Sequence, residues 1–366
     1  MPGRVVLAMS GGVDSSVAAY LLKQQGYEVI GLFMRTGVHG SDEGMEAGHK
    51  KGCCSAIDAA DARRVADRLR IPFYALDFEA DFDRIIDYFA DEYLAGRTPN
   101  PCVVCNSWLK FGKLWAYGRQ LEADFIATGH YAQVLRGAAD YELHRSADPD
   151  KDQSYVLFGL QRRLLPRLLF PVGGLRKEQV RAIARQAGLA VSDKADSVDL
   201  CFVPEGDHGS VIRRRRPELA TAGAIVDTSG KVLAQHRGIE NFTVGQRQGL
   251  GFAAGERRYV LRIVAEERAV VVGTRAELDS AGLLAERVNW LFARRPVGTL
   301  SCQVKMRYRQ SAVSARVRDV DGDRVQVDFA EPQSAVTPGQ AVVFYEGARV
   351  LGGGWIAAAI SAPIGL

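Results

Sequence analysis

Short apolar runs alternate with amphipathic helical stretches over the first half of the chain. Arg4–Met9 and Glu28–Phe33 have the length and composition of buried strands, and Ser15–Gln25 between them repeats with a helical period. Further strands are predicted at Phe73–Phe78 and Phe125–Ala127, and further helices at Ser55–Leu69, Phe82–Leu94 and Arg176–Gly188. This alternation predicts an α/β domain with a doubly wound parallel sheet, in which ligands bind at the carboxyl ends of the strands.

The pattern changes after about residue 205, where short strands and turn residues replace the helices. From about residue 282 it is almost purely β, with a hairpin turn at Asp321-Gly322-Asp323. The expected strands are Ala224–Asp227, Tyr259–Val264, Ala269–Val272, Leu300–Arg307, Ser314–Val320, Arg324–Phe329, Ala341–Tyr345 and Val350–Ile356. We predict three domains: an α/β domain at 1–207, a small mixed or β domain at 208–281, and a C-terminal β-barrel at 282–366.

Composition narrows the class of protein. Of the 366 residues, 47% are hydrophobic and 25% are charged, which is typical of a soluble globular protein. No apolar run is long enough to span a membrane, and Met1–Arg4 leads straight into a predicted strand. We therefore expect a cytoplasmic protein with no signal peptide and no membrane partner. The net charge of +4 neither requires nor excludes nucleic acid, and a solvated face is the simplest interpretation of the basic run Arg213–Arg216. The glycine-rich segment Gly37–Gly52 is predicted to be a mobile loop.

The segment AMSGGVDSS at 8–16 has the features of a phosphate-binding loop. A glycine pair between a strand and a helix lets backbone N–H groups close around phosphate oxygens, and the helix N-terminus adds positive potential. Ser10 and Ser15 offer hydroxyl groups, and Asp14 can orient the loop or help to hold Mg²⁺. The G-K-[ST] string is absent, so the lysine that serves transfer of the γ-phosphate in Walker-type loops is missing. Such a loop suits chemistry at the α-phosphate, in which AMP passes to an acceptor and pyrophosphate leaves.

The SGGVDS string resembles the PP-loop ATP pyrophosphatase superfamily, whose members adenylate an acceptor and then displace AMP with a nucleophile. The resemblance implies an adenine nucleotide hydrolase-like fold for the first domain, with Met34 and Gly129 lining the adenosine pocket. The ATP-binding residues that it implies are Ala8, Met9, Ser10, Gly11, Gly12, Val13, Asp14, Ser15, Met34 and Gly129.

Six cysteines in a cytoplasmic chain argue against a disulfide scaffold. Cys102 and Cys105 are spaced C-x-x-C in TPNPCVVCN at 98–106, where two prolines predict a rigid extended loop before a helix that starts near Lys110. Cys201 follows a predicted strand or turn. A buried structural role is expected for Cys53, Cys54 and Cys302.

Seven segments in order along the chain resemble the tRNA-specific 2-thiouridylase family. They are LFM at 32–34, CCS at 53–55, TPNPxxxCN at 98–106, ATGHYA at 127–132, KDQSY at 151–155, DxCF around Cys201 and FTVGQRQGLG at 242–251. The resemblance implies that ATP adenylates the C2 oxygen of the wobble uridine and that sulfur then displaces AMP. It further implies that Cys201 carries a persulfide from a sulfur-relay protein or cysteine desulfurase. Cys105 then either releases hydrosulfide from it or forms a disulfide with Cys201.

One position departs from the family pattern. The family commonly has Asp where this chain has Cys102. Cys102, Cys105 and Cys201 together form a set that could hold a 4Fe-4S cluster with one open iron for hydrosulfide. Zinc with a fourth ligand is a less attractive use of the same set. The persulfide and cluster routes both stay open at this stage.

A uridine in the anticodon loop must be splayed out to reach a nucleotide site. By resemblance, Asn100, Pro101 and Cys102 meet the target base, and the domain at 208–281 contacts tRNA. The other implied tRNA contacts are His130, Lys151, Asp152, Gln153, Arg307, Tyr308 and Gln340. Lys151 and Arg307 suit phosphates, Tyr308 offers stacking, and Arg213–Arg216 suits the tRNA backbone.

Two other functions account for part of this sequence but leave some of its features unexplained. A PP-loop amidotransferase-like enzyme acting on a small metabolite would need a glutaminase nucleophile or an amino-acid pocket, and it gives no reason for three cysteines near the site. An RNA-binding protein that has lost catalysis gives no reason for an intact SGGVDSS loop.

Overall fold

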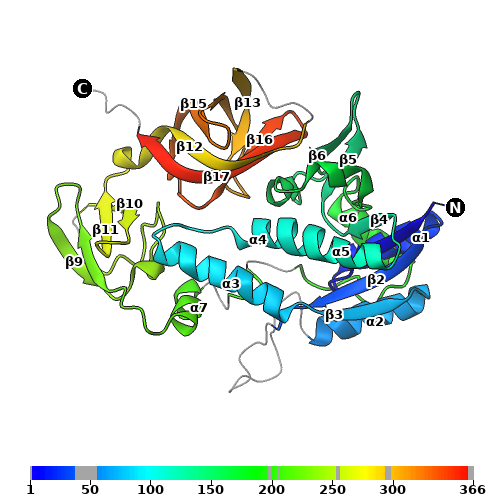
Figure 1. Ribbon diagram of the computed structural model, residues 1–366. Coiled ribbons are helices and arrows are strands. Elements are labelled where there is room, and N and C mark those ends of the chain that lie inside the picture. The colour runs from blue at the N-terminus through cyan, green and yellow to red at the C-terminus, as the bar shows by residue number, and fades with distance from the viewer. Residues whose placement is uncertain are drawn as a thin grey trace.

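The computed structural model describes residues 2–37, 56–196, 200–203, 207–252, 256–292 and 298–361. Figure 1 shows three sheets arranged around helices α3 (Glu79–Leu94) and α4 (Pro101–Val104), which run through the middle of the molecule. The predicted loop Gly37–Gly52, apart from its first residue, lies outside the described residues, as do Cys53 and Cys54.

The first sheet is parallel throughout and has the strand order β3-β2-β1-β4-β7. Its strands are β1 (Arg4–Ala8), β2 (Glu28–Arg35), β3 (Phe73–Asp77), β4 (Phe125–Thr128) and β7 (Leu168–Leu169). The helices that flank it are α1 (Val13–Gln24), α2 (Ala56–Leu69), α5 (Leu114–Gln120) and α6 (Lys177–Gln186), together with α3. The predicted α/β fold class is therefore confirmed.

Alternate residues of β1 show how both faces of this sheet are covered. Val5 and Leu7 pack with buried side chains of α1, α2 and α6. Val6 points the other way and packs with side chains of α3 and α5. A strand that is buried on both faces has a continuous apolar sequence, and this explains why β1 was predictable.

A four-stranded sheet of order β10-β11-β8-β9 follows helix α7 (His208–Arg215). Its strands are β8 (Gly223–Val226), β9 (Val232–His236), β10 (Tyr259–Val264) and β11 (Ala269–Gly273). The pair β8–β11 is parallel and the other two pairs are antiparallel. Ile225, Phe242 and Val260 belong to a small separate core beneath this sheet. The short helices η5 (Ile239–Asn241) and η6 (Ala276–Leu278) flank β10 and β11 in the chain.

The basic run Arg213–Arg216 mostly faces carboxylates. Arg215 Nε lies 2.7 Å from Asp87 Oδ1 on α3, and Arg216 Nη1 lies 2.8 Å from the same oxygen. The hydrogen bond from Arg215 lowers the pKa of Asp87 to about 2. The run therefore fastens the end of α7 to α3. The exposed Arg214 is the member best placed for the predicted contact with an RNA backbone.

Six antiparallel strands close into a barrel in the order β12-β15-β14-β13-β16-β17, because β12 pairs with β17 as well as with β15. They are β12 (Asp279–Trp290), β13 (Thr299–Lys305), β14 (Val313–Asp319), β15 (Val325–Ser334), β16 (Ala341–Glu346) and β17 (Arg349–Ser361). Closure leaves these strands without an open edge, and Leu283, Val304 and Phe344 lie in the barrel core. The predicted C-terminal barrel is confirmed. Its first strand begins at Asp279, just before the predicted boundary at 282.

The barrel is fixed against the α/β domain. The hairpin β5 (Ala132–Arg136) and β6 (Tyr141–Arg145) continues the barrel sheet, with His144 opposite Arg349 of β17. The buried Tyr155 hydroxyl, on the short helix η2 (Ser154–Leu157), lies 3.0 Å from Met306 O and 2.9 Å from Ala341 O of the barrel. A further short helix is η3 (Arg162–Arg167). Because the two units share one hydrophobic cluster, residues from both are held in fixed relation at the site.

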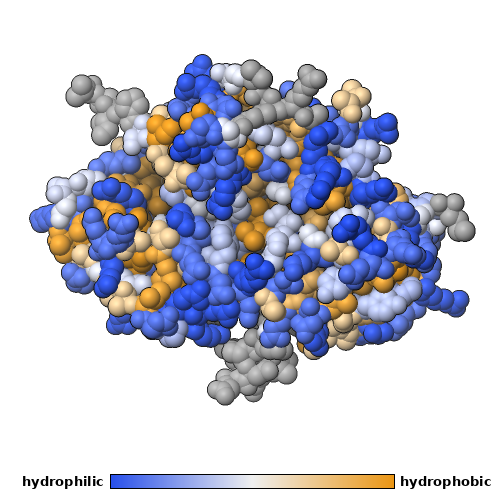
Figure 2. Space-filling model, viewed as in Figure 1, coloured by the Kyte–Doolittle hydropathy of each residue, from blue (hydrophilic) through white to orange (hydrophobic). Residues whose placement is uncertain are grey.

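Hydrophilic residues cover most of the face seen in Figure 2, and hydrophobic residues show between them in patches. Within the described ranges, no helix combines the length and apolar character needed to cross a membrane.

Candidate active site

The predicted phosphate loop lies where β1 ends and α1 begins. Gly11 has a φ of 74°, and Gly12 is the N-cap of α1. The Ser10 N–H donates to Ser15 Oγ at 3.2 Å, and the Ser15 and Ser16 hydroxyls donate to Gly12 O at 3.2 and 2.8 Å. These bonds hold the loop around the amino end of α1, where backbone N–H groups and the helix dipole favour an anion.

The residues predicted to bind ATP lie at one edge of the sheet. Ala8 pairs with Leu32 of β2 and with Thr128 of β4, so Met34 and Gly129 follow at the same carboxyl edge. A Cβ atom on Gly129 would lie 2.6 Å from the backbone nitrogen of Ser15, which shows how closely the end of β4 approaches the loop. The structure thus brings together residues from three strands that are distant in sequence.

Two lysines that the sequence analysis did not identify reach the loop. Lys177, at the start of α6, lies 2.7 and 2.9 Å from the carboxylate oxygens of Asp14. Lys194 Nζ donates to Gly11 O at 3.0 Å and to carboxylates of Asp58 and Asp61 at 2.6 Å each. The loop lacks a Walker lysine in its own sequence, but these two cations come from segments far along the chain. No motif marks them, since a lysine in a helical first turn and one between two aspartates are ordinary surface patterns.

A chain of ion pairs connects the loop to one of the predicted tRNA contacts. Lys177 also lies 2.8 Å from Asp196, and Lys151 lies 2.8 Å from the other oxygen of the same carboxylate. Burial alone raises the pKa of Asp196, but hydrogen bonds from Lys151 and Lys177 outweigh it and lower this pKa to about 2. The carboxylate therefore stays ionised and links Lys151 to Asp14 through Lys177.

The C-x-x-C segment is helical, so the prediction of an extended loop through Cys105 was wrong. Helix α4 begins at Pro101, and Asn100 is its N-cap, with Oδ1 accepting the Val103 N–H at 3.3 Å. Proline lacks an N–H and has a fixed φ, so it fits the first helical position as well as it fits a loop. A π-helix, η1 (Cys105–Lys113), follows, and Cys102 and Cys105 are three residues apart on one side of this continuous helix.

Cys105 and Cys201 pack against the same hydrophobic cluster. Both are half-buried, and Cys201 lies in the turn at 200–203. The neighbouring Phe202 ring makes edge contacts with Phe82 and Phe89 of α3, at 5.8 and 5.0 Å between centroids. This packing fixes the Cys201 turn against α3. Cys102 is exposed on α4. It lies close to Tyr308 of the barrel. Burial raises the pKa of the Tyr308 hydroxyl, and the charges of Asp152 and Cys102 raise it further.

Comparisons with known proteins show which family the chain belongs to. The chain matches the family models described as tRNA methyl transferase HUP domain over residues 3–205, tRNA methyl transferase PRC-barrel domain over 210–274 and Aminomethyltransferase beta-barrel domain over 280–356. It is 50% identical to the tRNA-specific 2-thiouridylase MnmA of Rhodopirellula baltica, over 98% of this chain and 97% of that one. It is 49% identical to that of Geotalea uraniireducens, over 98% and 96%. The chain belongs to the tRNA-specific 2-thiouridylase family.

Several tRNA contacts predicted for this 2-thiouridylase family member have structural partners inside the protein. His130 is buried, with Nδ1 2.7 Å from Thr128 Oγ1, and burial followed by nearby Lys110 lowers its pKa, so the ring is neutral. Asp152 is also buried and accepts N–H bonds from Ser146 and Ser154, while Gln153 accepts the Tyr131 N–H at 2.8 Å. These internal contacts fix the three side chains, and their contacts with tRNA stay predictions.

The other predicted contacts of this 2-thiouridylase family member lie around the entrance to the C-x-x-C helix. Gln340 Nε2 donates to Thr98 O at 3.1 Å and to Pro99 O at 3.0 Å, which fixes the segment that leads to Asn100. Arg307 is exposed on the barrel beside it, and Tyr308 is partly covered, with 40% of its surface exposed. Pro101 is buried. The contacts of Asn100, Pro101 and Cys102 with the target base stay predictions.

The three cysteines do not form a metal site in the described part of this 2-thiouridylase family chain. Among those residues, no three His, Cys, Asp or Glu side chains are placed to hold one metal ion. Cys102 is exposed, whereas Cys105 and Cys201 pack against the core. The iron–sulfur cluster considered from sequence stays a prediction, and we derive no step through one.

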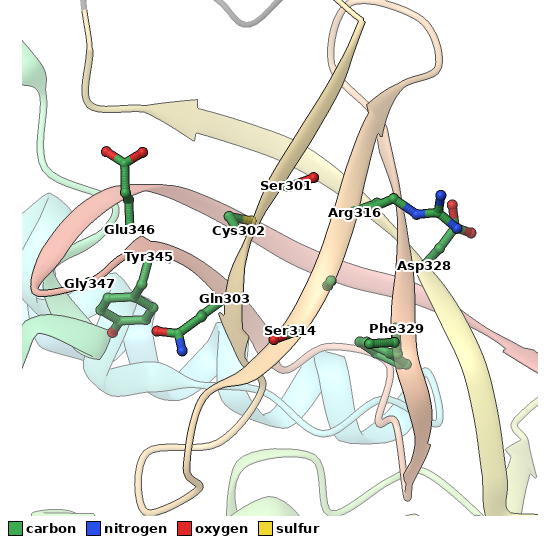
Figure 3. Close-up of a pocket in the computed structure, with 12 residues that line it drawn as sticks. Ser301, Cys302, Gln303, Ser314, Arg316, Asp328, Phe329, Tyr345, Glu346 and Gly347 are labelled. Atoms are coloured by element: carbon green, nitrogen blue, oxygen red, sulfur yellow. The ribbon is translucent and has the colours of Figure 1, made fainter.

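Cys302 lies on β13, in the wall of a cavity of about 590 Å³ on the barrel (Figure 3). Burial, followed by the nearby Glu346 carboxylate, raises the pKa of its thiol to about 12.

Cys302 is expected to resist iodoacetamide at mildly alkaline pH, because almost none of it is thiolate, and Cys302→Ser is expected to leave tRNA thiolation unchanged. Peptide mass spectrometry after timed alkylation measures this. Labelling of Cys302 as fast as the exposed Cys102 would contradict it.

Proposed function

We propose that this protein is a tRNA-uridine 2-sulfurtransferase that makes 2-thiouridine at the wobble position, with release of AMP and pyrophosphate. The observation that best supports this function is the joint position of the phosphate loop and the cysteine segments. The loop lies at the carboxyl edge of the parallel sheet, and Cys105 and Cys201 pack against the cluster on one face of that sheet. A phosphate loop and two half-buried thiols in a member of this family suit activation of an oxygen followed by its replacement with sulfur.

The first step is adenylation of the base. The uracil C2 oxygen attacks the α-phosphorus of ATP, and the bond from that phosphorus to the pyrophosphate oxygen breaks. The loop at Ser10–Ser15 binds the departing pyrophosphate, and Lys177 and Lys194 supply positive charge beside it. Mg²⁺ would neutralise further phosphate charge, and Asp14 would hold it by exchanging its contacts with Lys177 for the metal, since both carboxylate oxygens lie against that lysine. Adenylation makes the C2 oxygen a leaving group.

The second step replaces that oxygen with sulfur. The outer sulfur of a Cys201 persulfide attacks C2, and the C2–O bond breaks to release AMP. The Cys105 thiolate then attacks the inner sulfur, which forms a Cys105–Cys201 disulfide and leaves the outer sulfur on the base. A thiol reductant must reduce the disulfide before the next turnover. Alternatively, Cys105 attacks the persulfide first, and the released hydrosulfide attacks C2. Both sequences need a sulfur-relay protein or desulfurase as donor. We propose the cytoplasm as the location of the reaction, because ATP and tRNA are available there.

Lys194 is expected to matter for adenylation although it lies outside every motif. Lys194→Met removes the cation that contacts both Gly11 and the first turns of α2, so the rate of adenylation at low ATP is expected to fall by about a hundredfold. Release of pyrophosphate in the presence of tRNA measures this rate. Lys231→Met, at an exposed position in the central sheet region, is the matched control and should behave as the unaltered protein does. Equal rates for the two variants would remove Lys194 from the mechanism.

The function itself is tested with purified protein, ATP, Mg²⁺, unmodified tRNA and either a persulfide donor or sulfide. Nucleoside mass spectrometry should detect 2-thiouridine at the wobble position only when ATP is present. No product with any sulfur donor would overturn the proposal. Iron analysis and a visible spectrum of the anaerobically purified protein bear on the route, since an active protein without iron supports the cysteine route.

A further inference from the structure

A polar groove of about 440 Å³ lies where three parts of the chain meet. Thr98 comes from the segment before α4, Thr243–Gly245 from the FTVGQRQGLG motif, and the rest from the barrel and the residues leading into it. This volume lies in the range of small-ligand sites and accommodates about one nucleotide. The FTVGQRQGLG motif has no role in the two chemical steps, but its residues Thr243–Gly245 line this groove.

Two arginines give the groove positive charge. Arg307 Nη2 donates to Ala335 O at 2.7 Å, and Arg275 Nη1 donates to Ser334 Oγ. Both arginines are exposed, and none of the described residues that line the groove is acidic. The cavity around Cys302, by contrast, has Asp328 and Glu346 in its wall (Figure 3). Guanidinium groups together with threonine and serine hydroxyls suit a phosphodiester, which accepts hydrogen bonds and carries negative charge.

The groove continues the segment predicted to meet the target base. Thr98 lines it, and Asn100 is two residues further along the chain, so the two positions are at most about 7 Å apart. Gln340 also lines the groove and binds the Thr98 and Pro99 carbonyls. An RNA strand with one base at Asn100–Cys102 therefore has its neighbouring nucleotide within reach of this groove.

A glycine in the FTVGQRQGLG motif shows how the groove is built. Gly245 has a φ of 88°, and a Cβ atom there would lie 2.7 Å from the Ala335 Cβ atom of the barrel. The Gly245 N–H donates to Val260 O at 2.8 Å, and this bond ties the motif to β10. The motif thus brings its backbone directly against the barrel next to Arg307. A side chain at this position would push the two walls apart.

We propose that this groove binds the nucleotide next to the target uridine in the anticodon loop, with Arg275 and Arg307 on its phosphate. The proposal rests on the proposed function, because it takes tRNA as the substrate. It assigns a substrate subsite to Arg275 and to the FTVGQRQGLG motif. Bases that flank the target then contribute to recognition through a pocket shared by the central region and the barrel.

The test compares Arg275→Ala with Arg324→Ala. Arg324 precedes the opposite end of β15 from Ser334, roughly 30 Å away, so it changes charge equally without touching the groove. Binding of an anticodon stem-loop RNA is measured by fluorescence anisotropy over a range of salt. Arg275→Ala is expected to bind about tenfold more weakly, with a log–log salt slope shallower by roughly 0.7 per lost phosphate contact. Arg275→Lys, which keeps the charge, should restore part of the slope.

A second measurement locates the phosphate. Neutral methylphosphonate linkages are placed singly on either side of the target uridine, and each RNA is tested with both proteins. One linkage should weaken binding to the unaltered protein and cancel the effect of Arg275→Ala. The proposal is overturned if Arg275→Ala binds RNA as the unaltered protein does, or if Arg324→Ala loses as much. Formation of 2-thiouridine by the unaltered protein is followed in the same preparations, so failure of the groove and failure of the proposed function are told apart.

Discussion

Replacement of Cys201 by serine is expected to lower 2-thiouridine formation by at least about a thousandfold while adenylation of tRNA continues. A serine hydroxyl cannot carry a persulfide, so the donor has nowhere to place its sulfur. Adenylation depends on the phosphate loop and its lysines, which lie at the carboxyl edge of the sheet. Pyrophosphate release that depends on tRNA should therefore persist in Cys201→Ser.

Nucleoside mass spectrometry measures the thiolated product, and a phosphate assay measures pyrophosphate release in the same reaction. Cys302→Ser is the matched control, because Cys302 lies on β13 of the barrel and its thiol is held protonated by burial. Hydrosulfide added in excess should restore some product to Cys201→Ser, since it can attack the adenylated base directly. Product formation by Cys201→Ser at the rate of the control would exclude Cys201 as the sulfur carrier.

Replacement of Gly11 by alanine is expected to weaken ATP binding by at least about a hundredfold. Gly11 has a φ of 74°, and an added Cβ atom would lie 2.2 Å from the Asp58 carbonyl oxygen on α2. The loop cannot relieve this contact without moving away from α2. Its backbone N–H groups would then no longer converge on one anion, and Lys194 would lose its bond to the Gly11 carbonyl.

Gly230→Ala separates this clash from the cost of the backbone conformation. Gly230 has a φ of 87°, and nothing lies within 4 Å of the position of its Cβ atom. Both substitutions place alanine in the left-handed region, which costs about 1–2 kcal/mol. Calorimetry with a non-hydrolysable ATP analogue, together with the thermal midpoint, measures both effects. Equal loss of ATP affinity in the two variants would show that backbone strain, and not contact with α2, explains the result.

The local parts of the fold could be predicted from sequence. The apolar run that becomes β1 and the helical period that becomes α1 are visible because their burial is set by neighbouring residues. The barrel strands were predictable for the same reason, but the closure of β12 onto β17 was not, since it depends on pairing between distant segments. The pairing of β6 with β17, which joins the barrel to the first domain, could not be predicted for the same reason.

The candidate site likewise has local parts that could be predicted from sequence and distant parts that could not. The glycine and serine positions of the loop were predictable because one contiguous segment supplies them. Lys177 and Lys194 were not, because only the crossovers of the sheet bring α6 and the Lys194 segment to the loop. Pro101 misled the sequence analysis, since proline suits both a loop and the first turn of a helix, and the Asn100 cap decides between them. The catalytic roles of Cys105 and Cys201 stay predictions.

The central claim is that ATP activates the C2 oxygen of uridine, and the fate of that oxygen tests it most directly. A tRNA whose wobble uridine carries ¹⁸O at C2 is thiolated in unlabelled water, and the released AMP is analysed by mass spectrometry. The account predicts that the label moves to the phosphate of AMP in step with 2-thiouridine formation. Unlabelled AMP alongside the thiolated product would contradict adenylation of the base.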